Sequence, residues 1–435
     1  MVNHLFLEIP RKKCQLIFPD VTPDENAITI LNVRAYVIKS NETETNTGGS
    51  ADYHSQVDGH WIFGTDKWPI ANPMSLYEKY KSRRSTWGID AIGSVIAEIE
   101  LTNGIKGVGI SIGGQPACFI IENHFSRFLE GQDPLNVEYL WDLMWRSSIN
   151  YGRKGLTIQA ISAVDLALWD CAGKLRNEPV YKLLGGKTKN SLPCYATCYD
   201  PLAAKNLGFK GAKFPLPYGP ADGDVGMKRN IQRIKEIREA VGDDFPLMID
   251  CYMSLTVGYT LELLELIKPY NIKWLEEHLP PDQYDGYAQV KKQNPSKTLL
   301  TCGEHEYTRW GFKLLLDKNC VDLLQPDVTW CGGITEARRI VALASAYDVS
   351  IIPHGSSIYS YHLQYAFPNL TMGEFIFLSP NGDSISPSFG QLFNDEPLPI
   401  DGWIHLDPYK PGFGVTLNRK NLYRPYPRDN QSKSI

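Results

Sequence analysis

The chain has 435 residues, and 44 lysines and arginines against 49 aspartates and glutamates give it a formal net charge of −5. A hydrophobic content of 43% and a charged content of 21% are typical of a globular protein and exclude disorder of the whole chain. The mild acidity gives no general electrostatic reason to bind nucleic acid or an anionic membrane. The length suggests two domains, or one barrel with additions.

The cysteines and the N-terminus bear on the cellular compartment. Nine cysteines, with no CxxC pair among them, predict reduced and mostly buried thiols. Residues 1–9 lack a basic segment followed by an apolar one, which argues against a secretory signal. No uncharged run reaches the roughly 18 apolar residues that span a bilayer. We therefore expect a cytoplasmic protein.

The first third of the chain mixes strand and helix patterns. Residues 1–27, rich in proline and charge, are expected to form an N-terminal extension. The turn signal Asn103-Gly104 joins two alternating segments into a hairpin. An α+β domain over residues 28–155 is the simplest interpretation. Its expected strands are 27–37, 92–101 and 107–112, and its expected helices are 120–129 and 137–148.

From residue 156 the pattern changes to short buried strands that alternate with helices. Segment 156–175 carries apolar residues at helical spacing, and so do 230–241 and 335–346. Apolar strands separated by helices favour a parallel sheet, and eight of them fit a closed (β/α) barrel, assigned here to 156–390. The Pro-rich segment 391–435 is expected to return to the first domain. The eight expected strands are 192–197, 211–216, 245–251, 273–276, 299–302, 323–325, 350–353 and 375–377.

Polar side chains stand at or just beyond the ends of six successive barrel strands. They are separated by about 20 to 28 residues, roughly one βα unit, so all six should meet at the carboxyl-terminal face, where active sites of this fold lie. They are Asp250, Glu276, Glu304, Asp327, His354 and Glu374.

Three of these groups predict a metal site. Asp250, Glu276 and Glu304 end consecutive strands, and three close carboxylates cannot all stay ionised without a cation. Oxygen ligands favour Mg²⁺ over Zn²⁺, for which the sequence has no His or Cys cluster of suitable spacing. A single acid of this kind could equally be an ordinary exposed loop residue, but three in register favour a site.

Asp327 and His354 end the next two strands, which places them about 4.8 Å apart across a parallel pair. A carboxylate there can fix the imidazole tautomer and raise its basicity. A structural hydrogen bond is the plainer alternative. A base opposite a metal-held carboxylate suits removal of a proton next to that carboxylate, with the metal stabilising the enediolate.

At these residues the chain resembles the enolase superfamily, and within it the mandelate-racemase group. Three stretches resemble the L-rhamnonate dehydratase subfamily: Asp52-Tyr-His54, Gln325-Pro-Asp-Val-Thr-Trp-Cys-Gly-Gly333 and Pro353-His-Gly-Ser-Ser357. The resemblance implies an enolase-type (β/α)7β barrel with an α+β capping domain formed by the N-terminal part and the C-terminal tail. Further matching stretches are 82–88, Ser162-Ala-Val-Asp-Leu-Ala-Leu-Trp-Asp170, 179–185, Lys273-Trp-Leu-Glu-Glu277 and Lys410-Pro-Gly-Phe-Gly414.

The resemblance also implies a reaction and roles for named residues. The reaction is the loss of water from an aldonate to give a 2-keto-3-deoxy acid, which makes the chain a hydro-lyase. Family habit further implies a homo-oligomer. Asp250, Glu276 and Glu304 would bind Mg²⁺, His354 would be the base oriented by Asp327, Glu374 would stabilise the enediolate by hydrogen bonding, and His54 and Arg84 would bind substrate.

One departure from the family pattern concerns the second barrel strand. Many relatives carry Lys-x-Lys there, the second lysine being an alternative base, whereas this chain reads Lys213-Phe-Pro215. Racemisation needs a group on each face of the carbon and is therefore disfavoured. His354 is expected to remove the C2 proton and then to protonate the leaving C3 hydroxyl. Lys213 is either a substrate-carboxylate contact or a plain strand-end lysine, and His305 either points into the pocket or lies behind a metal ligand.

The sequence leaves the substrate open among several aldonates. L-Rhamnonate is the expected substrate, and L-lyxonate, L-mannonate or a galactonate are the alternatives. An apolar pocket discriminates one methyl group by only ~1–3 kcal/mol, so some promiscuity is expected. A catalytically idle barrel with a binding or structural role is the alternative of another class.

Overall fold

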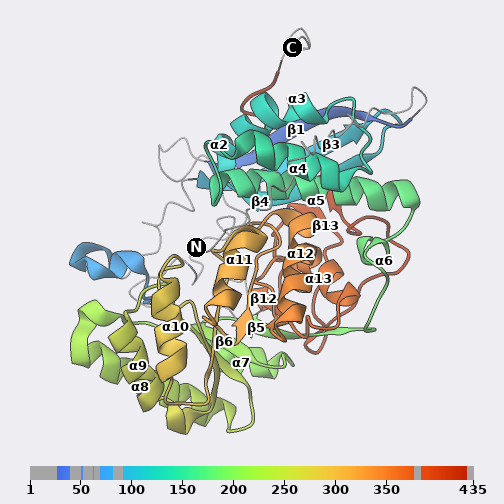
Figure 1. Ribbon diagram of the computed structural model, residues 1–435. Coiled ribbons are helices and arrows are strands. Elements are labelled where there is room, and N and C mark those ends of the chain that lie inside the picture. Colours follow the sequence, from blue (N-terminus) through green and yellow to red (C-terminus); the bar gives the residue numbers. More distant parts are fainter. Residues whose placement is uncertain are drawn as a thin grey trace, which may run out of the picture.

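The computed structural model describes residues 27–39, 50–51, 62, 69–81, 92–376 and 384–428 (Figure 1). His54 and Arg84, the two expected substrate contacts of the first domain, lie outside these residues, as does almost all of the expected extension 1–27. In the part of the chain that the structure covers, no helix has the length and apolarity to cross a membrane.

An antiparallel sheet forms the N-terminal part of the molecule. The hairpin expected at Asn103-Gly104 joins two of its strands, and the C-terminal tail adds another, because β16 pairs with β1. The tail therefore returns to the N-terminal sheet. The strands run in the order β16-β1-β3-β4, with β2 also paired to β1. Their bounds are β1 (Ile30–Lys39), β2 (Ser50–Ala51), β3 (Ser94–Leu101), β4 (Lys106–Ile112) and β16 (Leu422–Tyr423).

Helices cover this sheet. The helix expected at 120–129 begins earlier, at Gly114, and contains a π-helical turn. Helix α5 packs closely on β4 because Gly107 and Gly109 carry no side chain; a Cβ atom at either would lie 2.1 Å from a carbonyl oxygen of α5. The helices are α2 (Gly114–Ile120), η6 (Ile121–Phe125), α3 (Ser126–Leu129), α4 (Val137–Ser148) and α5 (Leu156–Arg176).

The rest of the chain forms the expected barrel of eight parallel strands joined by seven helices. The hydrogen-bonded order is β11-β10-β9-β8-β7-β6-β5-β12, and a single bridge from Ile351 to Leu370 lies between the two ends of this ladder. The predicted (β/α)7β order of strands and helices is thus confirmed. The strands are β5 (Leu192–Thr197), β6 (Ala212–Pro215), β7 (Leu247–Asp250), β8 (Ile272–Glu276), β9 (Leu299–Cys302), β10 (Leu323–Leu324), β11 (Ser350–Ile351) and β12 (Gly373–Ile376).

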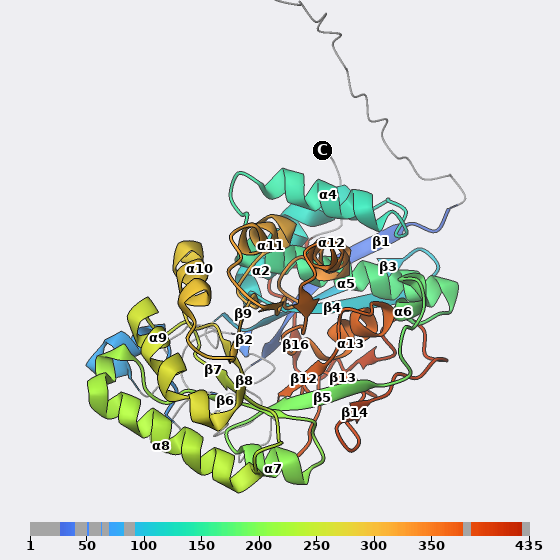
Figure 2. The same cartoon turned by 60° about the horizontal axis from the view of Figure 1, so that its bottom comes forward.

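The intervening helices lie outside the strands, as Figure 2 shows. They are α7 (Pro201–Asn206), α8 (Gly223–Val241), α9 (Val257–Leu266), α10 (Tyr284–Gln293), α11 (Thr308–Asp317), α12 (Gly333–Ala346) and α13 (Ser357–Ala366). Shorter elements complete the described chain: η3 (Pro73–Leu76), η4 (Glu78–Tyr80), α6 (Val180–Leu183), η7 (Pro220–Asp222), η8 (Lys268–Tyr270), β13 (Phe393–Asn394), β14 (Trp403–Ile404) and β15 (Thr416–Leu417).

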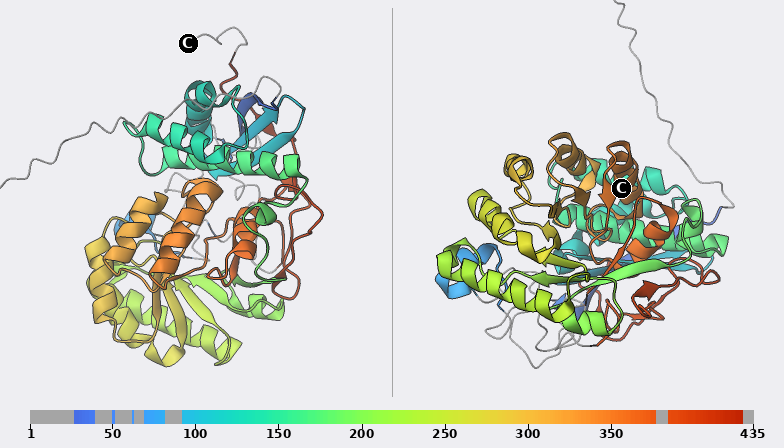
Figure 3. Two further views of the ribbon diagram at one scale, coloured as in Figure 1. Left: turned by 45° about the vertical axis from the view of Figure 1, so that its right-hand side comes forward. Right: turned by 90° about the horizontal axis from the view of Figure 1, so that it is seen from below.

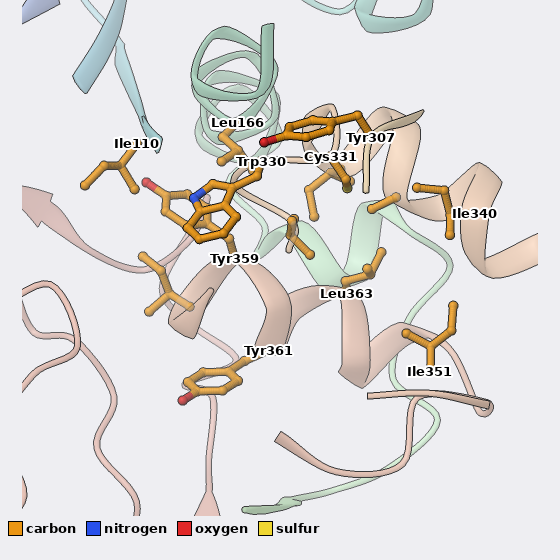
Figure 4. Packing of buried hydrophobic residues seen from close by; sticks show 14 of the residues in the cluster. Ile110, Leu166, Tyr307, Trp330, Cys331, Ile340, Ile351, Tyr359, Tyr361 and Leu363 are labelled. Carbon is orange, nitrogen blue, oxygen red and sulfur yellow. The ribbon is translucent and has the colours of Figure 1, made fainter. Parts of the chain in front are cut away.

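The N-terminal sheet and its helices form a layer against the barrel, which Figure 3 shows from two sides. One hydrophobic core runs through both parts. In Figure 4, Ile110 of β4 and Leu166 of α5 lie near Trp330 and Tyr359 of the barrel. The hydroxyl of Tyr359 donates to the carbonyl oxygen of Val108 in β4 at 3.3 Å. The two parts are therefore packed together, while the domain limits at 28–155 and 156–390 stay a prediction.

Candidate active site

Three buried carboxylates meet where β7, β8 and β9 end. Asp250 and Glu276 are the last residues of β7 and β8 and face each other in the ladder between the two strands, and Glu304 follows β9. One oxygen of each carboxylate lies within 4.8 Å of the others. All three residues are at most 4% exposed. The strand-end acids predicted from the sequence thus form one cluster.

Lys213 of β6 enters this cluster. Its Nζ forms an ion pair with Glu276, lies 2.8 Å from Glu374 Oε1 and lies 3.5 Å from Asp250 Oδ2. The lysine is 1% exposed. The sequence allows Lys213 two roles, a substrate-carboxylate contact or a plain strand-end lysine. In the structure its ammonium group compensates part of the charge of the acid cluster.

The donor set fits a hard divalent cation. Lys213 supplies one positive charge against the carboxylates of Asp250, Glu276, Glu304 and Glu374. Burial, together with the neighbouring acids, raises the pKa of Glu276 well above its ordinary value although Lys213 opposes the shift. A cation among the three oxygens would favour the ionised carboxylates, and an all-oxygen set is the preference of Mg²⁺.

Polar side chains from the barrel interior hold Glu276 in place. Its Oε2 accepts hydrogen bonds from Gln325 Nε2 at 2.7 Å and from Trp274 Nε1 at 3.1 Å. Gln325 is itself oriented by Thr301, whose hydroxyl donates to Gln325 Oε1 at 2.6 Å. Such second-layer contacts fix the orientation of metal-binding carboxylates.

Asp327 and His354 form a hydrogen-bonded pair beyond the ends of β10 and β11. His354 Nδ1 lies 2.6 Å from Asp327 Oδ2. The other oxygen of Asp327 accepts from the Thr329 amide and hydroxyl at 2.7 and 2.6 Å and from the Ser356 hydroxyl at 2.8 Å. With Nδ1 facing Asp327, the free ring nitrogen of His354 is Nε2.

Glu304 links the base to the acid cluster, because its Oε2 lies 3.5 Å from His354 Nε2. Burial alone would lower the pKa of His354, but the carboxylates of Glu304, Asp327 and Glu374 outweigh it and raise the pKa to about 10. The base nitrogen therefore faces the site expected to hold the cation.

Glu374 of β12 joins the acid cluster through Lys213. Its Oε1 accepts hydrogen bonds from the Thr197 hydroxyl and from Lys213, and its Oε2 is buried with no partner among the residues that the structure describes. Burial would raise the pKa of Glu374, but Lys213 and His354 outweigh it and lower the pKa. In this state Glu374 can accept a hydrogen bond but cannot donate one.

A second histidine–carboxylate pair lies beside the first. His305 Nδ1 is 2.8 Å from Glu277 Oε2 and 3.5 Å from Glu304 Oε1. Burial would lower the pKa of His305, but Glu277 outweighs it and raises the pKa to about 9. The Trp330 ring is close to both imidazoles, with centroid distances of 5.6 Å to His305 and 5.2 Å to His354.

The sequence predicted most of this constellation, and contacts connect eight of its ten expected residues. The two others, His54 and Arg84, lie outside the described residues. Sequence reasoning missed Glu277, Gln325, Thr329 and Ser356. Each of them stands next to or within two residues of a predicted site residue, in the Glu276-Glu277 doublet or in stretches 325–333 and 353–357, so proximity in sequence was the available signal.

Most of the chain is similar in sequence to known protein families. Residues 84–185 match the family model described as mandelate racemase / muconate lactonizing enzyme, N-terminal domain, and residues 202–421 match the model described as enolase C-terminal domain-like. The chain is 48% identical over 386 residues to an L-rhamnonate dehydratase of Saccharopolyspora erythraea, an alignment that covers 88% of this chain and 98% of that protein.

Solved structures agree. A crystal structure of rhamnonate dehydratase from Gibberella zeae complexed with Mg superposes with a TM-score of 0.86 at 47% identity, covering 92% of this chain and 97% of that one. L-talarate/galactarate dehydratase from Salmonella typhimurium LT2 shares the fold, with a TM-score of 0.72 at 24% identity over 94% and 95% of the two chains. The chain belongs to the enolase superfamily, in the mandelate racemase and muconate lactonizing enzyme family.

Proposed function

We propose that this chain is an acid-sugar dehydratase, a hydro-lyase that converts L-rhamnonate to 2-keto-3-deoxy-L-rhamnonate and water. The observation that carries the proposal is the complete Asp327–His354 pair, whose free Nε2 faces Glu304 of the three-acid cluster. The 48% identity to an L-rhamnonate dehydratase over 88% of the chain supports the choice of substrate.

Asp250, Glu276 and Glu304 would hold the Mg²⁺ ion. When bound, the ion would withdraw charge from the substrate carboxylate and so make the adjacent C2 proton more acidic. The roles of the protein's own residues follow from their positions around this cluster.

His354 would act as both base and acid. Its Nδ1 donates to Asp327, so in the neutral ring Nε2 is the nitrogen that would take the C2 proton. The same Nε2–H can then be given to the C3 hydroxyl on the same face, which leaves as water. The electrons of the C2–H bond form the C2–C3 double bond of an enol, which rearranges to the 2-keto-3-deoxy acid.

The second barrel strand supports elimination rather than racemisation. Pro215 stands where many relatives have a second lysine, so β6 offers only Lys213, and that lysine is paired with Glu276 and Glu374. Elimination from one face needs only one acid–base group. His354 alone can therefore serve both proton transfers.

Substrate contacts complete the proposal. His54 and Arg84 stay predicted substrate ligands, Arg84 through the forked donors of its guanidinium group. His305, held by Glu277, would offer a cationic ring to substrate oxygens. Glu374 stays a predicted hydrogen-bonding partner of the enediolate, for which it would have to carry a proton; as a carboxylate it would instead accept a hydrogen bond from a substrate hydroxyl.

The test is a turnover screen of the purified chain with Mg²⁺ against a panel of aldonates, with the 2-keto-3-deoxy product detected as its semicarbazone. We expect Mg²⁺-dependent turnover of L-rhamnonate above L-lyxonate, L-mannonate and galactonate. Preference for another aldonate would show that the proposed substrate is wrong and that the proposed dehydration is right. No turnover of any aldonate by folded, Mg²⁺-binding protein would favour the idle-barrel alternative.

We also propose a cytoplasmic, homo-oligomeric protein. All eight cysteines in the described part of the chain are buried and unpaired, which suits a reducing compartment. The oligomeric state stays a prediction from the family resemblance. Light scattering on the purified chain would measure it directly.

A further inference from the structure

The loop that carries Asp327 is held by the N-terminal part of the chain. We call residues 327–333 the Asp327 loop. The hydroxyl of Ser111 in β4 donates to the carbonyl oxygen of Thr329 at 2.6 Å, and Trp141 Nε1 of α4 donates to the carbonyl oxygen of Gly332 at 2.8 Å. Two elements outside the barrel therefore fix the path of a loop that belongs to its active site.

Helix α5 fixes the far end of the same loop. The Gly332 amide donates to Ser162 Oγ at 2.9 Å, and Asp165 Oδ2 accepts from the Thr335 amide at 3.0 Å. Gly333 has a φ of +76°, and a Cβ atom there would lie 2.3 Å from Asp165 Oδ2, so only glycine fits against this helix. The Asp327 loop is thus bound along its length rather than mobile at its tip.

Within the loop, Thr329 connects these contacts to the base. It is 3% exposed, and both its amide and its hydroxyl donate to Asp327 Oδ1. With the Ser356 hydroxyl, Oδ1 receives three donors, which leaves Oδ2 for His354 Nδ1. Charge-assisted hydrogen bonds of this kind restrict the rotation of a carboxylate.

We propose that Thr329 is a positioning residue for the base, and that Ser111 of the N-terminal sheet acts through it. Thr329 fixes the plane of the Asp327 carboxylate so that Oδ2 meets His354 Nδ1 and Nε2 is turned toward the acid cluster. The catalytic consequence rests on the proposed function; the geometric consequence for His354 does not. The N-terminal sheet then contributes to the orientation of the base as well as to the covering of the barrel.

The test compares Thr329→Val, which loses only the hydroxyl, with Thr329→Ser, which keeps it. Thr260→Val is the matched control, because the hydroxyl of this buried threonine donates to the carbonyl oxygen of Thr256, the N-cap residue of its own helix α9. Thr329→Val should lower kcat on the order of tenfold, the worth of one hydrogen bond to a charged group, with KM and the Kd for Mg²⁺ unchanged. Thr329→Ser should restore kcat, and Thr260→Val should leave it unaltered.

A second readout needs no turnover. The 2.6 Å His354–Asp327 bond should give a downfield proton resonance of His354 Nδ1–H that is absent from His354→Asn. Thr329→Val should broaden or shift it, and Thr329→Ser should not. If the chain turns over no aldonate, the proposed function fails while this signal still decides the role of Thr329.

The role proposed for Ser111 is tested by comparing the effects of single and double variants on kcat. Ser111→Ala should lower kcat less than Thr329→Val, and the double variant should lose less than the product of the two effects, because both act on one chain of contacts. Independent effects would overturn the role of Ser111. An unchanged resonance in Thr329→Val, or equal damage by valine and serine, would overturn the role of Thr329.

Discussion

The two halves of the site are built on different principles. On the β7–β9 side, Lys213 pairs with Asp250 and Glu276, and Glu304 faces the rings of His305 and His354 at 3.5 Å. Each of these cations is shared with a further carboxylate, so negative charge remains in excess. On the β10–β11 side, both oxygens of Asp327 are occupied by donors from Thr329, Ser356 and His354. We call the three acids the acid half and the Asp327–His354 pair the base half. The acid half needs a bound cation to compensate its charge, whereas the protein itself supplies every partner of Asp327 in the base half.

The difference has a consequence for stability and for function. A buried charge without a partner costs free energy, so the acid half should gain from Mg²⁺. A hydrogen-bonded pair should keep its geometry whether or not the cation is bound, and should lose that geometry only when its own partners are removed. Variants in the two halves should therefore separate metal binding from proton transfer.

The largest effect is expected in the base half. His354→Asn removes the only described histidine bonded to Asp327, and loss of a positioned base lowers turnover by about 10²–10⁴-fold. The Kd for Mg²⁺ should change little, because the three acids are intact. Steady-state kinetics and calorimetry measure the two quantities. A variant that kept substantial turnover would contradict the role of His354; His124→Asn, on the outer helix η6, is the matched control.

The acid half is tested by Lys213→Met. Removing this cation leaves the buried carboxylates of Glu276 and Glu374 without their cationic partner, which should lower the free energy of unfolding of the Mg²⁺-free protein by about 3–5 kcal/mol. Mg²⁺ should recover part of the loss, because it compensates the same oxygens. Urea unfolding with and without Mg²⁺ measures both values.

Lys235→Met is the control, since that lysine is half exposed and its pair with Glu239 spans 3.8 Å. If Mg²⁺ stabilised Lys213→Met no more than it stabilises wild type, the picture of shared compensation would be wrong.

A smaller effect is expected from Gln325→Leu. Gln325 touches Glu276 and not the base, so its loss should weaken Mg²⁺ binding by about 10–100-fold, as for other second-layer contacts of metal ligands. The downfield proton of His354 should be unchanged. Calorimetric titration with Mg²⁺ checks the first point and proton NMR the second. Gln232→Leu, on the exposed face of α8, is the matched control; equal losses in both variants would argue against the assignment.

The architecture could be predicted from the sequence because the hydrophobic spacing of strands and that of helices are both local patterns. Strands β5 and β9 fall at the predicted 192–197 and 299–302, since apolar runs bounded by polar residues leave little freedom. Strands β10 and β11 are shorter than expected, because Pro326 and Pro353 follow closely and have no N–H to donate to a ladder. The helix predicted at 120–129 begins earlier, at Gly114. Pro116 lies in its first turn, and a proline does not signal a helix by hydrophobic spacing.

The site was predictable to the extent that strand ends converge. Strand register alone places Asp250 opposite Glu276, and it puts Asp327 and His354 just beyond the ends of two adjacent strands. The partners of Lys213 could not be predicted, because its reach across the barrel to Glu374 on β12 depends on how the sheet curves. The link from Ser111 to Thr329 spans 218 residues, and no local pattern encodes such a contact.

The smallest effect concerns the one residue that both halves share. Glu304 contributes to the raised pKa of His354, about 10 in the cation-free protein, so His354 carries its proton at about pH 8. Mg²⁺ at Glu304 compensates that carboxylate and should lower the pKa of His354, which favours release of the proton. Mg²⁺ binding should then release a fraction of a proton and tighten as the pH rises. His305, whose pKa is about 9 and which also faces Glu304, should add to the release.

Calorimetry at about pH 8 in two buffers of different ionisation enthalpy measures this release. It should fall in His354→Asn and stay at the wild-type value in His124→Asn, because burial lowers the pKa of His124 and that ring is already neutral. Release that is unchanged in His354→Asn would mean that cation and base do not communicate through Glu304. In that case the two halves of the site would be independent, and the 3.5 Å approach of Glu304 to His354 would have no influence on the proton that the reaction moves.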